Sequence, residues 1–145
     1  MKNYQLTKKQ IKQEEGVSLT VYRCTEGHRT IGWGHKLPEN SPMTHISLEY
    51  ANKLFEKDFN AALFQAYKIP FFEKLSEPRQ CVILNMIFQL GYKGTLKFKK
   101  TLRFIEEGNY TEAAQEIKRS KLYSQTRNRV NRLAVMLQND EFRFN

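Results

Sequence analysis

The stretch that decides the fold is EEGVSLTVYRCTEGHRTIGWGHKL, residues 14–37. It opens on the last turn of an amphipathic helix, and Gly16 is the type of residue that ends one. Apolar and polar residues alternate through 19–24, which is the periodicity of a β-strand. The segment TEG at 25–27 supplies a turn, and 31–34 predicts a second, tight strand whose glycines allow sharp bending. A helix followed directly by an antiparallel hairpin is therefore predicted.

The remainder of the chain is predicted to be helical. Thr7 and Gln10 have the spacing of a capping box at the start of the first helix. Ser47 is expected to cap a long helix that runs to about Tyr67. A helix over 76–91 has a proline in its first turn and is apolar nearly all round, so we expect it at the centre of the larger core. Further helices are expected at about 96–106, 111–119 and 127–138.

These elements predict an α+β fold in a single domain over residues 1–145. A small β lobe at about 16–46 and a larger helical lobe, formed by 68–145 with the N-terminal helix, would be joined by the helix at 47–67. A chain of 145 residues, of which 40% are apolar, is long enough to bury a substantial core. A cleft between the two lobes follows from this arrangement.

The chain is strongly basic, with a formal net charge of +9. This charge favours an anionic partner, either a bacterial envelope or a nucleic acid, although a solvated basic surface with no specific partner is also compatible with it. No apolar run reaches the roughly 20 residues needed to span a bilayer. Because the N-terminus lacks the apolar core of a secretory signal, we expect the protein to be made and kept in a cytoplasm until it is released.

The two cysteines do not form a disulfide framework. Cys81 lies in the apolar run CVILNMIF, where a small buried hydrophobic residue is expected. Cys24 has polar neighbours in the predicted hairpin. Because His28, His35 and His45 are not spaced as zinc ligands, neither a metal nor another cofactor is expected.

Glu15, Cys24 and Thr30 are separated by eight and then five residues, and the helix and hairpin would aim all three at one point. The negative end of the helix dipole and the adjacent Glu14 both favour a protonated carboxyl at Glu15. A carboxylic acid facing a second polar group across a cleft is the arrangement that cleaves glycosidic bonds. An ordinary solvated glutamate at a helix end is the alternative interpretation.

The same residues resemble the phage-type lysozymes (endolysins) of the T-even phage lysozyme group. The signature of that family is a Glu, eight residues, an Asp or Cys, five residues and a Thr. The resemblance extends in order along nearly the whole chain. It includes Leu54-Phe55 with Asp58, NMIFQLG at 85–91 and YSQTRNR at 123–129. A lysozyme-like fold is implied, with a β-hairpin lobe and a helical lobe joined by a long helix.

The resemblance implies hydrolysis of the β-1,4 bond between N-acetylmuramic acid and N-acetylglucosamine in peptidoglycan. Glu15 would protonate the leaving oxygen and Thr30 would hold the attacking water, while Cys24 occupies the position of the second carboxylate. The family is regarded as inverting, which requires acid and base roughly 6.5–9.5 Å apart. The implied partners are glycan strands and the anionic bacterial envelope, for a monomer that leaves the host cytoplasm after membrane permeabilisation and lyses the cell. No nucleic acid is expected.

The resemblance places four further residues along or near the saccharide cleft: Phe88, Gln89, Thr101 and Lys36. Two supporting pairs are also expected. Arg129 would hydrogen-bond the Glu14–Glu15 end of the first helix and place the acid. His35 would pair with Asp58 and tie the small lobe to the connecting helix, an interaction that fixes orientation more than it stabilises.

Cys24 stands where many such sites carry an aspartate. An aspartate is ionised at neutral pH, whereas an ordinary thiol, with a pKa of about 8.5, is mostly protonated. Three roles stay open for Cys24: it positions or deprotonates the water as a partial thiolate, it packs beside the site, or it attacks the sugar covalently. The first is our hypothesis, and the last is least favoured because a thioglycoside would hydrolyse slowly.

Three other functions compete with a glycosidase. A lysozyme-like module that binds peptidoglycan without cleaving it would follow if the cysteine impaired catalysis. A basic nucleic-acid binder would use the arginines and lysines, but these lack a recognised motif and do not alternate with aromatic residues. A peptidase built on Cys24 and His28 lacks an evident orienting partner.

Overall fold

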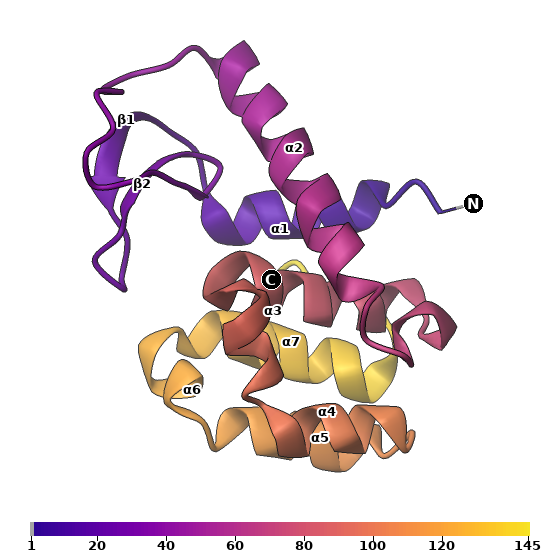
Figure 1. The fold of residues 1–145 in the computed structure, drawn as a ribbon. Helices are drawn as coiled ribbons and strands as arrows, with labels where there is room; N and C mark the ends of the chain where they lie inside the picture. Colours follow the sequence, from indigo (N-terminus) through magenta and orange to yellow (C-terminus); the bar gives the residue numbers. More distant parts are fainter. Residues whose placement is uncertain (1) are drawn as a thin grey trace.

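The computed structural model describes residues 2–145, which form seven α-helices, a short 3-10 helix and one three-stranded antiparallel sheet (Figure 1). The predicted α+β class is confirmed. The elements in chain order are α1 (Gln5–Glu15), β1 (Ser18–Arg23), β2 (Arg29–Gly32), β3 (His35–Lys36), α2 (Leu48–Ala66), η1 (Phe72–Lys74), α3 (Glu77–Leu96), α4 (Lys99–Glu106), α5 (Tyr110–Lys118), α6 (Lys121–Gln125) and α7 (Arg127–Asn139).

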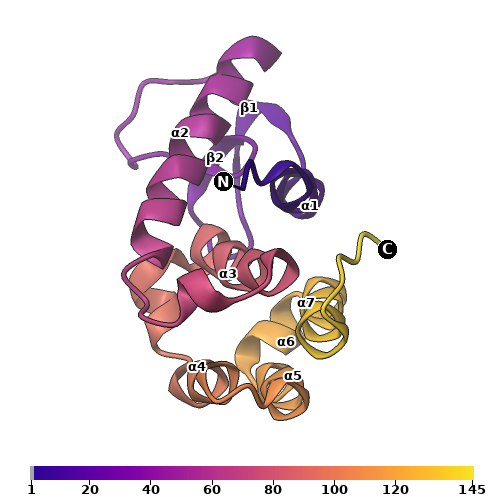
Figure 2. The same cartoon turned by 90° about the vertical axis from the view of Figure 1, so that its right-hand side faces the viewer.

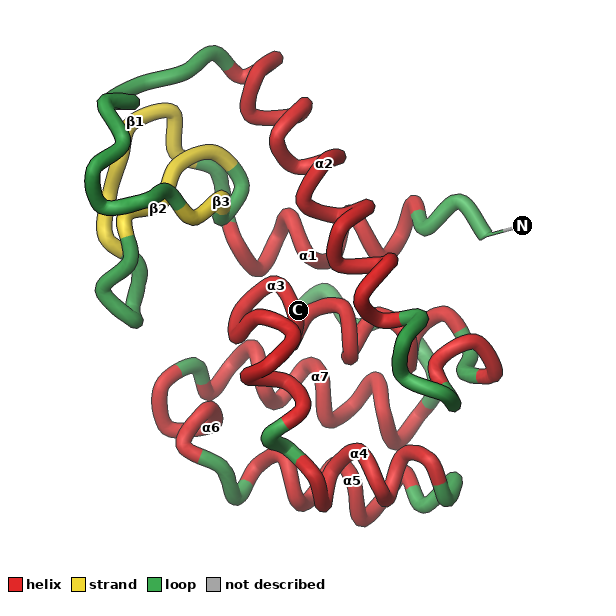
Figure 3. The backbone as a smooth tube through the Cα atoms, in the orientation of Figure 1, coloured by secondary structure: helices red, strands yellow, loops and turns green. Residues whose placement is uncertain are grey.

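The sheet lies at one end of α2, and helices α3 to α7 gather at the other end (Figures 1 and 2). All three strands come from the segment between α1 and α2, and the rest of the fold is helix and loop (Figure 3). Helix α2 contacts the sheet through β2 and β3 and contacts the helical part through α3. It therefore connects the hairpin to the helices, as the sequence predicted for its long central helix.

The start of α1 differs from the predicted capping box. The helix begins after Tyr4, which adopts a left-handed conformation with φ of 58° and makes no side-chain cap. Thr7 lies inside the helix, fully buried, and its hydroxyl donates to Glu77 at 3.2 Å. Tertiary burial overrides the local signal here, because Tyr4 packs against Phe59 and is only 4% exposed. The predicted end is confirmed: Gly16, with φ of 68°, donates its N–H to the carbonyl of Lys12.

The hairpin is three-stranded rather than two-stranded. The second strand begins at Arg29 and ends at Gly32, two residues earlier at each end than the predicted 31–34. Gly32 and Gly34 have φ values of 67° and 76°, so the chain turns at this point instead of extending. The turn returns β3 along β2 and pairs Thr30 with Lys36. Lys36 therefore lies beside Thr30 in the sheet.

Helix α2 follows its predicted boundaries closely. The Ser47 hydroxyl accepts a hydrogen bond from the N–H of Tyr50 at 3.0 Å, which is the expected cap. The buried residues of the helix recur at helical spacing and face the sheet and α3: Ala51, Phe55, Phe59, Ala62 and Ala66. The ring of Phe55 lies 5.5 Å from that of Phe88 on α3, centroid to centroid. This aromatic contact fixes the position of α3 relative to α2.

Helix α3 forms the centre of the helical core, as predicted. Every residue from 80 to 89 is buried, so the helix is enclosed on all sides. Cys81 is fully buried among them, and burial raises the pKa of its thiol above the usual range. The regular helix breaks at Gly91, where φ is 78°, and one further turn runs to Leu96. The predicted end at Gly91 is thus a kink.

The remaining helices lie within a few residues of their predicted positions, but the short η1 and α6 are additional elements. Periodicity is a weak signal over so few residues, which explains why neither was predicted. In the part of the chain that the structure describes, no helix is both long and apolar enough to cross a membrane.

Candidate active site

A cleft of about 640 Å³ lies between the hairpin and the start of α7. Glu15, Cys24 and Thr30 all line it, so the structure brings together the three residues that the sequence spacing identified. Each comes from a different local context: a helix end, a hairpin turn and the following strand. The opposite wall is formed by the start of α7 and by Gln89 on α3.

Glu15 is held by an arginine from the far end of the chain. The guanidinium of Arg129 donates to Oε2 of Glu15 at 2.9 Å, and both side chains are largely buried, with 9% of Arg129 and 12% of Glu15 exposed. Arg132, one helical turn further along α7, makes two hydrogen bonds of 2.6 Å to the Glu14 carboxylate. These bonds raise the pKa of Arg132 against the opposing effect of burial. Each carboxyl at the end of α1 therefore has its own arginine, where the sequence predicted a single one.

Gly34 closes the other side of the Glu15 carboxyl. A Cβ atom on Gly34 would lie 2.4 Å from Oε1 of Glu15, far inside van der Waals contact. The turn between β2 and β3 therefore brings backbone directly against the acid, and only glycine fits there. Glu15 is confined between this backbone and Arg129.

The hydroxyl of Thr30 is oriented by the hairpin itself. Thr30 is 2% exposed, and its Oγ1 donates to the carbonyl of His28 at 2.8 Å. The same carbonyl accepts the backbone N–H of Cys24 at 2.9 Å, which closes the turn. Because the hydroxyl proton is used internally, the oxygen offers only lone pairs to the cleft. Cys24, half-buried, lines the same wall.

Two further ionisable groups line the cleft near these residues. Burial raises the pKa of Tyr22, and its electrostatic interactions with Glu15 and Cys24 act in the same direction. The signal available in the sequence for Tyr22 was the alternation predicted through residues 19–24, which places Tyr22 on the same side as Cys24, two residues further along. Partial burial tends to raise the pKa of Glu26, but hydrogen bonds from Thr25 and Cys24 hold it below its usual value.

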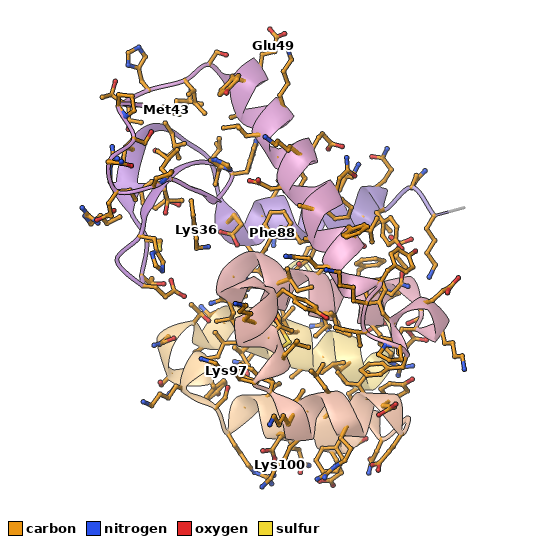
Figure 4. The ribbon with its side chains drawn as sticks, in the orientation of Figure 1. Lys36, Met43, Glu49, Phe88, Lys97 and Lys100 are labelled. Atoms are coloured by element: carbon orange, nitrogen blue, oxygen red, sulfur yellow. The ribbon has the colours of Figure 1, made fainter. Side chains whose placement is uncertain are left out.

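The expected substrate-binding residues do not all lie together. Gln89 lines the cleft, and its amide nitrogen donates to Thr126 at 3.0 Å, while its buried Oε1 has no partner within residues 2–145. Lys36 reaches from β3 to α3 and donates to the carbonyl of Phe88 at 3.2 Å (Figure 4). The Phe88 side chain is 9% exposed and packs mainly into the core. Thr101 lines a separate pocket of about 420 Å³ at the start of α4.

The structure contains the expected contact between His35 and Asp58. Nδ1 of His35 lies 2.7 Å from Oδ2 of Asp58, and about a quarter of each side chain is exposed. The contact joins β3 to α2. It anchors the turn that carries Gly34, and so the wall against which Glu15 rests.

Known proteins are similar to this chain over most of its length. The chain matches the family model described as "Phage lysozyme" over residues 12–134, a segment that includes the whole cleft-lining hairpin. It is 32% identical to "Probable T4-type lysozyme 1" of Dictyostelium discoideum, with 90% of this chain and 92% of that protein covered. It is also 32% identical to "Probable T4-type lysozyme 2" of the same organism, with 87% and 89% covered.

A third relative is matched over about a quarter of its own length. The chain is 28% identical to "Pre-baseplate central spike protein Gp5" of Enterobacteria phage T4, over 88% of this chain and 26% of that protein. The family model and the relatives covered at nearly full length agree with the resemblance seen in the sequence. The chain therefore belongs to the phage lysozyme family and is a glycoside hydrolase.

Proposed function

We propose that this protein is an endolysin that cleaves the β-1,4 bond between N-acetylmuramic acid and N-acetylglucosamine in bacterial peptidoglycan and so lyses the host cell. One observation carries the proposal: a carboxyl, a thiol and a hydroxyl line a single cleft, with the carboxyl held by Arg129. Such a cleft can place an acid on one side of a glycosidic bond and a water on the other.

Glu15 acts as the general acid in this proposal. Its Oε2 accepts a hydrogen bond from a cation, so the acidic proton belongs on Oε1, the oxygen that faces Gly34. The proton moves from Oε1 to the leaving glycosidic oxygen as the bond to the anomeric carbon breaks. The close approach of the Gly34 backbone fixes the position of this oxygen.

Thr30 and Cys24 act on the water. Oγ1 of Thr30 has only lone pairs to offer, so it accepts one proton of the water in a hydrogen bond and turns a water lone pair toward the anomeric carbon. Cys24 takes the second proton when it is a thiolate, becoming a neutral thiol, or orients that proton as the new carbon–oxygen bond forms. Attack from the face opposite the leaving group gives inversion.

The unpaired acceptor of Gln89 supports a role in substrate binding. A buried carbonyl oxygen without a partner is costly, and a turn of the Gln89 side chain toward the cleft would let a donor on the glycan satisfy it. Gln89→Met is expected to raise KM by about tenfold with kcat changed by less than about threefold, since one hydrogen bond to the substrate is lost. Steady-state kinetics on soluble glycan strands measure both parameters.

The matched control for Gln89→Met is Thr126→Val. It removes the internal hydrogen bond from the Gln89 amide nitrogen but leaves the Oε1 acceptor in place. Its KM should stay near the wild-type value. Equal increases in KM for the two variants would show that Gln89 acts through the packing of α6 and α7 instead of through the substrate.

Gly34→Ala tests the confinement of the acid. The new Cβ would displace the Glu15 carboxyl, and a displacement of about 1 Å can cost roughly 10²-fold in rate. Gly32→Ala is the control, because its φ is equally unfavourable while its Cβ would meet Ala51 at an ordinary 3.5 Å. Both variants should lose roughly 1–3 kcal/mol of stability. Only Gly34→Ala should lose most of its kcat; equal losses in both would contradict the proposed contact.

The charge and surface of the chain support the proposed partner. A net charge of +9 attracts the protein to an anionic envelope, whose stem peptides carry carboxylates. We propose that the protein acts as a monomer on glycan strands and reaches the wall from the host cytoplasm once the membrane is permeabilised.

The proposed function is tested on purified peptidoglycan by measuring new reducing ends. Borohydride reduction of the products should convert N-acetylmuramic acid, and not N-acetylglucosamine, to its sugar alcohol. N-acetylglucosaminitol alone would assign the opposite bond specificity. Binding to the sacculus without new reducing ends would show a non-catalytic binding module.

A further inference from the structure

A buried chain of hydrogen bonds links the two carboxyl groups at the end of α1. Gln10 donates from Nε2 to Glu14 at 2.7 Å and accepts at Oε1 from Nδ2 of Asn85 at 2.6 Å. Oδ1 of Asn85 accepts from Arg129 at 3.0 Å, and Arg129 donates to Glu15 at 2.9 Å. The chain of contacts therefore runs from Glu14 through three side chains to the acid.

In this chain of hydrogen bonds, the residues at the two ends determine which amide atoms donate and which accept. Glu14 is bound by a guanidinium and, as a carboxylate, only accepts, so Gln10 must turn its nitrogen toward it. Arg129 only donates, so Asn85 must turn its oxygen toward it. Flipping either amide would place two donors or two acceptors face to face. Both amides therefore have one satisfied orientation.

The chain of hydrogen bonds connects three helices that are distant in sequence. Gln10 is on α1, Asn85 on α3 and Arg129 on α7, and the first two are fully buried. The bonds of Asn85 to Gln10 and to Arg129 are buried from solvent, so each strongly restricts its partner. The Nε of Arg129 is buried without a hydrogen-bond partner within residues 2–145. The guanidinium thus depends on Asn85 and Glu15 for its orientation.

We propose that Gln10 is a positioning residue for the catalytic acid, acting through Asn85 to hold Arg129 against Glu15. The inference rests on the proposed role of Glu15. Gln10 does not line the cleft, and so it cannot contact the glycan directly. The buried Cys81 thiol also contacts Gln10, but it donates only a weak hydrogen bond of 3.8 Å to Oε1 of Gln10.

Gln10→Met removes both hydrogen bonds while nearly keeping the side-chain length. Asn85 keeps only the weaker acceptors on Cys81, its carbonyl at 3.1 Å and its sulfur at 3.5 Å, so Arg129 should become mobile. We expect kcat to fall about tenfold with KM within about twofold of wild type.

A further variant separates positioning from stability. Thr7→Val removes a partly buried hydrogen bond from the same helix outside the chain of contacts and should lower Tm while leaving kcat unchanged. If Thr7→Val and Gln10→Met give the same kinetics at equal loss of Tm, Gln10 is only structural and the proposal fails.

A spectroscopic readout keeps this inference separate from the proposed function. In protein with labelled arginine, NMR exchange rates of the Arg129 guanidinium should rise in Gln10→Met and stay at the wild-type value in Thr7→Val. Unchanged exchange in Gln10→Met would overturn the positioning role whatever the substrate. Absence of reducing ends from the wild type would instead overturn the proposed muramidase activity.

Discussion

Glu15→Gln is expected to abolish the release of reducing ends from peptidoglycan, with kcat reduced by roughly 10²–10⁴-fold. The amide keeps the shape of the side chain but has no acidic proton for the leaving oxygen. Its oxygen can still accept from Arg129, so we expect the fold to survive with a loss of about 1–3 kcal/mol. Turbidity of a peptidoglycan suspension and the Tm of the purified variant measure the two effects.

The control for this variant is Glu56→Gln. It removes the same charge from a glutamate that is ion-paired with Lys8 at 2.8 Å and does not line the active-site cleft. Its kcat should stay within about threefold of wild type. Wild-type lysis by Glu15→Gln would end the glycosidase interpretation of this cleft, because no other residue is proposed to supply the proton.

Substitution of Cys24 has the second largest expected effect. Cys24→Asp should retain lytic activity, because a carboxylate is ionised at neutral pH and can take or orient the water proton. Cys24→Ser should lose at least about tenfold, because a serine hydroxyl does not ionise at these pH values. Initial rates of reducing-end release for the two variants, compared with wild type, test this ranking.

Chemical modification gives an independent test of the same residue. Cys24 lines the cleft and is partly exposed, whereas Cys81 is fully buried. A thiol-alkylating reagent should therefore modify Cys24 in the folded protein and inhibit it, and Cys81→Ala should be inhibited equally. An unchanged rate in Cys24→Ser would favour a packing role. A glycosyl adduct on Cys24, detected by mass spectrometry, would favour covalent attack.

The parts of the fold that were predictable are those fixed by local chemistry. Gly16 ends α1, Ser47 caps α2, and the continuous apolar run of α3 occupies the core centre, as expected. Each depends on neighbours within one or two turns of chain. The capping box at Thr7 and Gln10 failed because both side chains are used for long-range buried contacts with α3.

The third strand was also beyond prediction from local pattern. His35 and Lys36 are too few to show strand periodicity, and they pair with β2 only because two glycines reverse the chain. That reversal places Gly34 against Glu15 and sends Lys36 across to α3. A short-range turn thus determines part of the site by bringing distant residues into contact.

The sequence by itself determined the three cleft residues, because their spacing along a helix and hairpin follows from regular geometry. Only the tertiary structure decided which arginine binds which carboxyl group. Arg129 and Arg132 lie one turn apart on the same side of α7, and Glu14 and Glu15 are adjacent, so both assignments satisfy the sequence. The choice depends on how α1, α3 and α7 pack, where Gln10 and Asn85 orient Arg129 toward Glu15.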